Sequence, residues 1–271
     1  MNNLKMYCLS LNPNHLDLIE KIGYVPVGLG SKNFSNTWQN EKLGINISNK
    51  NLFYGEYTFH YNLWKNNLLK KEEWIGFCQY RKFWTLNKDD IYYNSFDGFN
   101  LNILKNIPSS LNNFETILGE ELYVNQFRFS KFIKRNLKTM LANPVLFLSS
   151  KKRNIKFHFD MWHGKGNLDK AILLLDKEDR NDFNHFVNTN VSFNPHNMFI
   201  CRNINALLKY YETLFPWLER CEKVFGFDQL EEYGLKRIYG FLAERFMSYW
   251  FKKNTKYSLM PILFKDINDF L

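Results

Sequence analysis

Two cations, Arg81 and Lys82, stand just beyond a continuous apolar run, W-I-G-F-C, at residues 74–78. A short apolar run without polar alternation is typical of a strand that is buried on both faces of a sheet. Ligands of open α/β sheets bind beyond the carboxyl ends of the strands, so the two cations could meet an anionic substrate. The alternative is a strand end with two solvated basic side chains, and the spacing fits both.

The segments before this strand must position it. Apolar side chains recur at three- and four-residue spacing, which predicts a helix with one broad aromatic face made by Tyr57, Tyr61, Leu63, Trp64 and Leu68. Further back, a strand at 5–11, a helix at 15–23 and a strand at 24–27 are predicted. This is the order in which nucleotide-binding α/β domains begin.

Two polar stretches follow the second predicted strand. The backbone of Gly28 and Gly30 could approach a base or a ribose, although a lone G-x-G also makes a simple tight turn. In the loop at 34–51, the amide of Asn46 and the hydroxyl of Ser48 could bind the hydroxyls of a sugar or a ribose. The alternative is that both side chains satisfy the backbone of their own loop.

The second half of the chain offers groups for acid–base chemistry. His158 and His163 flank Asp160, and imidazole and carboxylate groups at such spacing could exchange protons with a substrate. A strand is predicted over 191–201, where the amide of Asn197 could hold a hydroxyl group. The alternative for this position is a turn of Asn and His after proline.

Two helices are predicted to close the chain, and Pro216 should kink or divide the first of them. The second carries an apolar stripe made by Leu235, Ile238, Tyr239, Leu242, Phe246 and Trp250. At about 100° per residue, Glu244 lies nearly opposite this stripe. The pattern therefore places Glu244 off the core face, either in solvent or facing a second surface.

Several motifs in the chain resemble one known family. They are N-I-S-x-K-N at 46–51, Y-x-E-x-T at 54–58, W-K-N at 64–66, I-G-x-C-x-Y-R-x-F at 75–83, N-M-F-I at 197–200 and G-F-L-A-E-R at 240–245. They resemble a family of bacterial capsule and O-antigen glycosyltransferases long catalogued as a domain of unknown function. The resemblance spans most of residues 5–250. It implies an α/β fold of the GT-A type, with a central mostly parallel sheet and C-terminal helices.

The resemblance also implies roles for single residues. The UDP-sugar donor would be bound by Gly28, Gly30, Asn46, Ser48, Tyr80, Arg81 and Lys82, with the two cations at the diphosphate. Glu244 would be the catalytic base, and Asp160 is the second candidate for this role. Contacts to the acceptor or to anionic groups would come from His163, Asn197, Arg237 and Arg245. The family usually has Cys-His-Tyr-Arg-Arg at the strand end, and because Gln79 replaces the His, no role of that His carries over.

No tightly bound cofactor or metal is expected. Metal-dependent glycosyltransferases hold a divalent ion with an Asp-x-Asp motif. Here the acidic pair Asp89 and Asp90 is adjacent and stands in a polar loop, where a solvated turn is the simpler interpretation. Whether the reaction uses a divalent ion such as Mn²⁺ or Mg²⁺ is left open.

The four cysteines form no C-x-x-C pair, and three of them stand in apolar runs, which indicates buried thiols in a reducing compartment.

Composition narrows the class of partner. With 45% hydrophobic residues and 26 Phe the chain can bury a large core, and its net charge of +9 favours an anionic partner. The basic residues are dispersed, which argues against a nucleic-acid-binding arm. A segment at 127–138 mixes aromatic and basic residues and could touch anionic lipid, although an ordinary helix with a solvated basic face is the alternative.

The sequence lacks a signal peptide and any run near the roughly 20 apolar residues of a membrane span, so we expect a cytoplasmic protein, with peripheral contact to the inner membrane face left open. The expected organisation is one domain over 1–271. It would comprise a nucleotide-sugar half at 1–118, an insertion at 119–156 and an acceptor half at 157–271.

The predicted activity is an inverting hexosyl transfer, with galactofuranose as the sugar that the resemblance suggests. The donor would be a UDP-sugar and the acceptor a glycan or lipid-linked glycan. The alternative is a non-enzymatic protein that binds anionic glycan or lipid.

Overall fold

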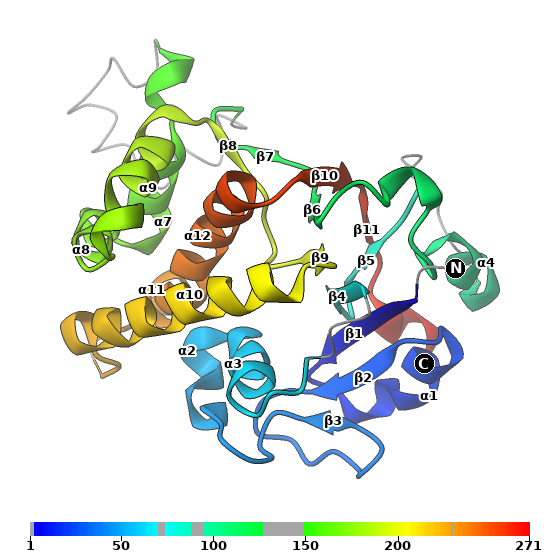
Figure 1. Cartoon of the computed structure of the whole chain (residues 1–271). Coiled ribbons are helices and arrows are strands. Elements are labelled where there is room, and N and C mark those ends of the chain that lie inside the picture. The colour runs from blue at the N-terminus through cyan, green and yellow to red at the C-terminus, as the bar shows by residue number, and fades with distance from the viewer. Residues whose placement is uncertain (1–2, 70–73, 88–94, 127–148, 229) are drawn as a thin grey trace. The chain divides into compact units, whose positions relative to one another are not determined.

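The computed structural model describes residues 3–69, 74–87, 95–126, 149–228 and 230–271 (Figure 1). Two compact units alternate along the chain. The first, the sheet unit, comprises Met1–Glu120, His196–Thr213 and Trp250–Leu271. The second, the helical unit, comprises Glu121–Pro195 and Leu214–Tyr249. The expected halves at 1–118 and 157–271, with an insertion at 119–156, stay a prediction.

The sheet unit is built on a mixed sheet in the order β10-β6-β9-β4-β1-β2-β3. Its parallel part consists of β1 (Leu4–Ser10), β2 (Val25–Gly28), β3 (Gln39–Asn40) and β4 (Trp74–Gln79). Strand β9 (Phe199–Cys201) runs antiparallel between β4 and β6 (Thr116–Gly119), and β10 (Tyr257–Met260) is parallel to β6. Strand β5 (Lys82–Trp84) pairs antiparallel with β4 and with β11 (Ile262–Phe264). The predicted α/β class with a largely parallel sheet is confirmed.

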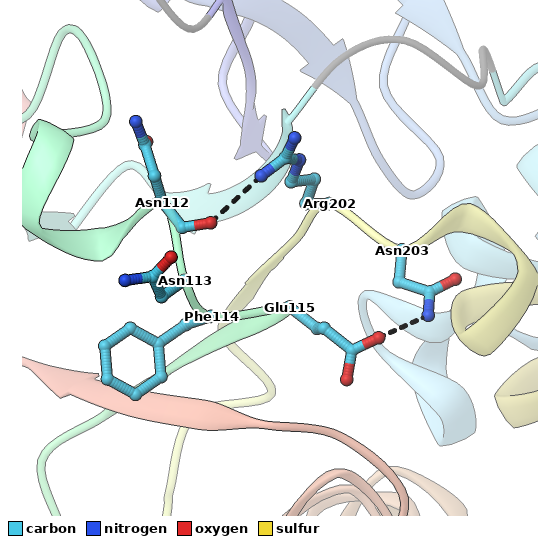
Figure 2. Close-up of a pocket in the computed structure, with 6 residues that line it drawn as sticks. All are labelled: Asn112, Asn113, Phe114, Glu115, Arg202 and Asn203. Atoms are coloured by element: carbon cyan, nitrogen blue, oxygen red, sulfur yellow. Dashed lines mark hydrogen bonds between the residues drawn. The ribbon is translucent and has the colours of Figure 1, made fainter.

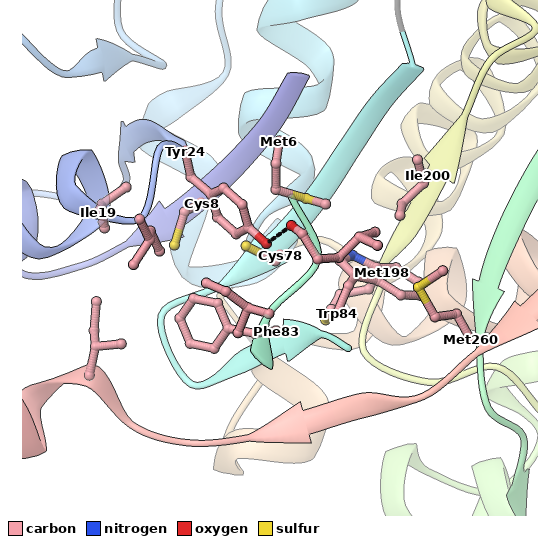
Figure 3. Packing of buried hydrophobic residues seen from close by; sticks show 14 of the residues in the cluster. Met6, Cys8, Ile19, Tyr24, Cys78, Phe83, Trp84, Met198, Ile200 and Met260 are labelled. Carbon is pink, nitrogen blue, oxygen red and sulfur yellow. Dashed lines mark hydrogen bonds between the residues drawn. The ribbon is translucent and has the colours of Figure 1, made fainter. Parts of the chain in front are cut away.

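The pair β1–β4 lies at the centre, with Tyr7 opposite Phe77 and Cys8 opposite Cys78. Because side chains alternate along a strand, the two residues of each pair point to the same face. On the face of Cys8 and Cys78, the core is completed by α1, β5 and the C-terminal segment, with Ile19, Tyr24, Phe83, Trp84 and Met260 among its members (Figure 3). The prediction that 74–78 is a strand buried on both faces is confirmed. All four cysteines are buried and free, which was expected for the three in apolar runs.

The other face of β1–β4 is covered by α3 (Tyr57–Lys65). The ring of Phe59 meets Tyr7 edge-on at 5.2 Å between centroids, and the ring of His60 lies 4.2 Å from Phe77. His60 Nδ1 also bonds to the hydroxyl of Tyr211 at 2.7 Å. The predicted helix is therefore confirmed, but its predicted inner face is only partly right. The helix buries its Phe59 and His60 side against the sheet, and Leu68 is exposed because it lies beyond the end of α3 at Lys65.

Short helices complete the sheet unit. They are η1 (Pro13–His15), α1 (Leu16–Lys21), η2 (Ser48–Lys50), α2 (Asn51–Tyr54), α4 (Phe96–Asn102), η3 (Ser109–Leu111) and η5 (Ile267–Phe270). The predicted strand at 191–201 is wrong as a single element. It is divided into β8 (Ser192–Phe193) and β9, because His196 and Asn197 adopt φ values of 79° and 55°, which end an extended strand. The alternative of an Asn/His turn is thus what the structure shows.

The helical unit contains α7 (Ile155–His163), α8 (Asn167–Leu173), α9 (Lys177–Thr189), α11 (Glu232–Lys236), η4 (Ser150–Lys152) and the small pair β7 (Leu122–Tyr123) and β8. Helices α10 (Ile204–Phe225) and α12 (Ile238–Asn254) each contribute one part to each unit. Phe183 anchors the core of the helical unit, with Phe246 at 5.4 Å and Trp217 at 6.0 Å. Pro216 lies inside α10 without dividing it. Among the described helices, none combines the length and apolar character that crossing a bilayer requires.

The buried position of His60 predicts acid sensitivity. Burial lowers the pKa of His60 to about 3, against 6.5 for an ordinary histidine. As the pH falls below 6.5 the unfolded chain binds this proton first, so stability is complete above pH 6.5 and is lost toward pH 3. The loss should approach about 1.4 kcal/mol per pH unit for each such histidine.

The measurement is the free energy of unfolding in urea between pH 7 and pH 4. The variant His60→Phe should show a shallower dependence on pH than the wild type, whatever its absolute stability. The control is His185→Phe, at an exposed position on α9, which should keep the wild-type slope. Equal slopes in His60→Phe and the wild type would contradict the expected proton uptake.

Candidate active site

Polar side chains gather where the parallel strands of the sheet unit end. Ser10, Gly28 and Gln79 are the last residues of β1, β2 and β4, and parallel pairing puts these ends at one edge. We call it the carboxyl edge. Because β9 runs antiparallel to β4, the turn that precedes β9 brings His196 and Asn197 to the same edge. Substrates of open α/β sheets bind at such an edge.

Glu56 is the centre of a hydrogen-bond network at the carboxyl edge. It stands just before α3, and its Oε1 atom accepts from Gln79 Nε2 at 3.0 Å and from Asn197 Nδ2 at 3.0 Å. The same Gln79 amide donates to the carbonyl oxygen of His196 at 3.0 Å. Asn197 was expected to hold an acceptor hydroxyl; here its amide orients a carboxylate. Sequence reasoning missed Glu56, although it is the acidic residue of the Y-x-E-x-T motif.

The basic residues of the strand end join this network. Lys82 Nζ donates to Gln79 Oε1 at 3.2 Å, so Gln79 connects an ammonium group to the carboxylate of Glu56. Burial, together with the charge of Lys82, lowers the pKa of His196 to about 3. At neutral pH His196 is therefore uncharged, and Lys82 supplies positive charge beside Glu56.

Arg81 faces outward at the same edge. Its Nε donates to Asp266 Oδ2 at 2.7 Å, and its guanidinium carbon lies 4.7 Å from the ring centroid of Tyr80. More than half of the side chain is exposed, and no described residue engages its two terminal nitrogens. Burial alone would raise the pKa of Asp266, but hydrogen bonds from Asn268 and the charge of Arg81 lower it. The result is an exposed, oriented guanidinium that can still donate to an anion.

The predicted glycine loop lies at the end of β2. Gly30 has φ of 80°, and its N–H donates to Glu41 Oε1 at 2.8 Å. Glu41 is fully buried and also accepts from the hydroxyl of Thr58, and burial raises its pKa. A Cβ on Gly28 would overlap the ring of Phe34. Gly28 is thus required by local packing and Gly30 by its positive φ, which is the tight-turn alternative, and Glu41 fixes the turn at the carboxyl edge.

Asn46 and Ser48 serve their own loop, the alternative left open from the sequence. Asn46 Nδ2 donates to the carbonyl oxygens of Lys42 and Gly44, and its Oδ1 accepts from the backbone and the hydroxyl of Ser48. The amide that was expected to bind a sugar or ribose hydroxyl is therefore already engaged at both ends.

Glu244 and Arg245 form a buried ion pair in the helical unit. The prediction that Glu244 lies off the core face is wrong: Glu244 is 8% exposed and Arg245 2% exposed, because α12 is packed on almost every side. The Arg245 guanidinium lies 4.4 Å from the ring centroid of Phe193, and its Nη2 lies 3.2 Å from His158 Nδ1. In this arrangement Arg245 is enclosed by the protein rather than presented to an anionic substrate.

The other predicted groups of the helical unit are also engaged. Asp160 Oδ1 accepts from the backbone N–H of Gly166 at 3.0 Å, and its Oδ2 lies 3.4 Å from Lys156 Nζ. His163 stacks on Phe241 at 4.0 Å, and burial together with the charge of Arg245 lowers its pKa to about 2. Arg237 contacts the hydroxyl of Tyr233 at 3.4 Å. His163 is therefore neutral at pH 7 and a weak proton acceptor, and its expected acid–base role stays a prediction.

Comparison with models of known protein families shows which family the chain belongs to. A family model described as "Domain of unknown function (DUF4422)" matches residues 7–255. The chain belongs to the DUF4422 family. A solved structure titled "WbbM bifunctional glycosytransferase apo structure" has a similar fold, with a TM-score of 0.66 and 20% sequence identity. The match covers 97% of this chain and 45% of the other, so the chain spans less than half of that protein. No curated protein matches the chain.

A pocket, drawn in Figure 2, lies elsewhere in the sheet unit. This hollow of about 260 Å³ is lined by Asn112, Asn113, Phe114, Glu115, Arg202 and Asn203. These residues precede β6 and follow β9, so they lie at the edge of the sheet opposite to the carboxyl edge. Several of its polar groups bond to one another: Arg202 donates to the carbonyl oxygen of Asn112, and Asn203 donates to Glu115.

No metal site is found among the described residues. In the described part of this DUF4422 chain, no group of three or more His, Cys, Asp or Glu side chains could hold a metal ion. Asp89, Asp90 and the basic-aromatic segment at 127–138 lie outside the described residues. The expectation of metal-independent chemistry stays a prediction.

The buried pair in α12 predicts that losing Glu244 alone lowers the stability of the protein more than losing both charges together. Removing the charge of Glu244 leaves the Arg245 guanidinium buried without its counter-ion, and breaking a buried ion pair in this way typically costs about 3–5 kcal/mol. The variant Glu244→Gln should therefore lose stability, whereas Glu219→Gln, at an exposed position in α10, should lose little.

Urea unfolding of both variants measures this difference. The double variant Glu244→Gln/Arg245→Met should recover much of the loss, because no unpaired charge is left inside the helical unit. A wild-type stability for Glu244→Gln alone would mean that the carboxylate is solvated after all.

Proposed function

We propose that the chain is a glycosyltransferase that moves a sugar from a UDP-sugar to a hydroxyl of a glycan or lipid-linked glycan in the synthesis of a surface polysaccharide. Galactofuranose is the proposed sugar, on the basis of the family resemblance alone. One observation carries the proposal. A carboxylate oriented by two amides, Glu56, and an exposed guanidinium, Arg81, lie at the same edge of the sheet. The similar fold of a glycosyltransferase supports it.

The proposed reaction is an inverting displacement with Glu56 as the base. The acceptor hydroxyl would give its proton to the Glu56 carboxylate while its oxygen bonds to the anomeric carbon of the donor. The bond from this carbon to the diphosphate would break, and its electron pair would leave with UDP. A general base must stand within hydrogen-bond reach of the proton it accepts. The amides of Gln79 and Asn197 would hold Glu56 in this orientation.

Positive charge at the leaving group is the second requirement of the reaction. Arg81 and Lys82 would stabilise the charge that develops on the diphosphate, as preorganised cations do in transfer reactions. The terminal nitrogens of Arg81 can form a two-pronged contact with phosphate oxygens while Nε stays on Asp266. The ring of Tyr80 restricts the guanidinium to this orientation. The loop of Gly28 and Gly30, fixed by Glu41, would lie against the nucleoside.

This proposal replaces Glu244 by Glu56 as the first candidate base. Glu244 and Asp160 remain testable alternatives, but their carboxylates are already engaged by Arg245 and by the Gly166 backbone, respectively. Glu56 differs in its position, because the amides of Gln79 and Asn197 orient its carboxylate at the carboxyl edge of the sheet unit.

Arg81→Ala should weaken the binding of UDP at least tenfold, because a charge-assisted contact between guanidinium and phosphate is worth roughly 1.5–3 kcal/mol. Isothermal titration with UDP measures the dissociation constant. Arg202→Ala is the matched control, since it removes an exposed arginine from the opposite edge of the same sheet. An unchanged dissociation constant in Arg81→Ala would remove this residue from the donor site.

Glu56→Gln should lower the rate of transfer by about 10²–10⁴, the usual contribution of a general base. Its amide oxygen can still accept from Gln79 and Asn197, so the affinity for UDP and the melting temperature should stay close to wild type. The measurement is the release of UDP from a panel of UDP-sugars with a glycan acceptor. Glu20→Gln, at an exposed position on α1, is the control.

Two results would change the assignment. If Glu56→Gln transfers normally while Asp160→Asn at unchanged melting temperature, or Glu244→Gln at a temperature where it is still folded, is inactive, the base lies in the helical unit. If the wild type binds UDP-sugars but neither transfers nor hydrolyses them, the non-enzymatic alternative holds instead.

A further inference from the structure

The turn at residues 42–45 presents two large aliphatic side chains to solvent. Leu43 is 69% exposed and Ile45 59% exposed, with Gly44 between them at φ of 68°. Exposed aliphatic residues are common on protein surfaces when they stand alone. Here two of them project from one tight turn, so the feature needs a reason.

The backbone of this turn is satisfied from within the protein. Three asparagine amides bond to four consecutive carbonyl oxygens: Asn46 to those of Lys42 and Gly44, Asn62 to that of Leu43 and Asn66 to that of Ile45. Asn66 Oδ1 also accepts from the N–H of Ile45 at 3.0 Å. A backbone without open carbonyl groups loses little hydrogen bonding when water is removed around it. Such a backbone can approach the hydrocarbon region of a bilayer, where no water replaces lost hydrogen bonds.

The side chains beside the turn are those that prefer a membrane interface. Asn62 and Asn66 fix the turn to the end of α3, where Tyr61 and Trp64 are partly exposed. Lys65 Nζ lies 3.7 Å from the ring centroid of Trp64. Amphipathic aromatic rings are enriched at the level of lipid headgroups, and lysine ammonium groups are attracted by anionic lipids.

The charges around the turn are complementary to an anionic surface. Between residues 42 and 69 the sequence has three lysines, Lys42, Lys50 and Lys65, and one acidic residue, Glu56. Glu56 is engaged by Gln79 and Asn197 at the carboxyl edge, and the preceding Glu41 is fully buried against Gly30. The sequence of this stretch therefore carries a net positive charge, with three lysines against one glutamate.

We propose that this surface, the turn at 42–45 together with the end of α3 at 61–66, docks the protein on an anionic lipid bilayer. Leu43 and Ile45 enter the interface between headgroups and acyl chains, Lys42 and Lys65 contact the anionic headgroups, and Tyr61 and Trp64 lie at their level. This goes beyond the proposed function and does not depend on it.

Sedimentation with vesicles tests the proposal. The wild type should bind vesicles of phosphatidylcholine with phosphatidylglycerol, bind pure phosphatidylcholine weakly, and dissociate as salt is raised. The double variant Leu43→Gln/Ile45→Gln should lower the partition coefficient at least tenfold, because two buried aliphatic side chains are lost from the interface. Lys42→Gln and Lys65→Gln should each lower it about fivefold, the effect expected for one lysine at an anionic surface.

The matched control is Leu86→Gln/Leu101→Gln. These leucines are 59% and 84% exposed, and they flank another connected pair, since Asn87 Nδ2 bonds to Asn102 Oδ1. This variant should bind vesicles as the wild type does, and equal melting temperatures would show that both double variants fold. Vesicle binding that is absent in the wild type, or equal in the two double variants, would overturn the proposal. So would a wild-type dimer in light scattering that Leu43→Gln/Ile45→Gln converts to a monomer, because the surface would then pair two copies.

Discussion

The parallel pair β1–β4 is buried on both faces, and the rest of the sheet unit follows from this constraint. One face is sealed by the rings of α3, and the other by the cluster around Tyr24, Phe83 and Trp84. A strand sealed on both sides cannot carry solvated polar groups along its length, because burying them without partners is costly. Polar side chains are consequently confined to the strand ends, where Gln79 and the two cations after it stand. The chemistry of the sheet unit is therefore found at an edge, and the interior serves to hold that edge in place.

The local parts of this arrangement could be predicted from the sequence. The apolar run of β4, the β-α-β opening and the cations after Gln79 are read from neighbouring residues, and all three predicted elements are present in the structure. The role of Glu56 could not be predicted in the same way. It depends on Asn197, far along the chain, and on the turn with positive φ that ends one strand and starts another. Glu244 was misplaced for a related reason: a helical wheel with one apolar stripe assumes one dry face, whereas α12 is enclosed and pairs Glu244 with Arg245.

Asparagine has a larger structural role than its abundance suggested. A composition rich in Asn invites the interpretation of compositional drift, yet individual amides close specific structures. Asn197 orients a carboxylate, Asn268 fixes the ring of His15, and three further asparagines saturate the turn at 42–45. An amide carries a donor and an acceptor on one short side chain, so it can bond to two backbone groups at once. These roles depend on geometry at close range and leave no periodic signal in the sequence.

The alternation of the two units along the chain has a consequence for how the protein is made. Strands β10 and β11 pair with β6 and β5, which are synthesised long before them, and segments of the helical unit are interposed. During translation, β5 leaves the ribosome before its partner β11 is made, and β6 before its partners β9 and β10. Unpaired strand edges are templates for association with other chains. The nascent chain thus carries open edges on β5 and β6 until β10 and β11 have been made.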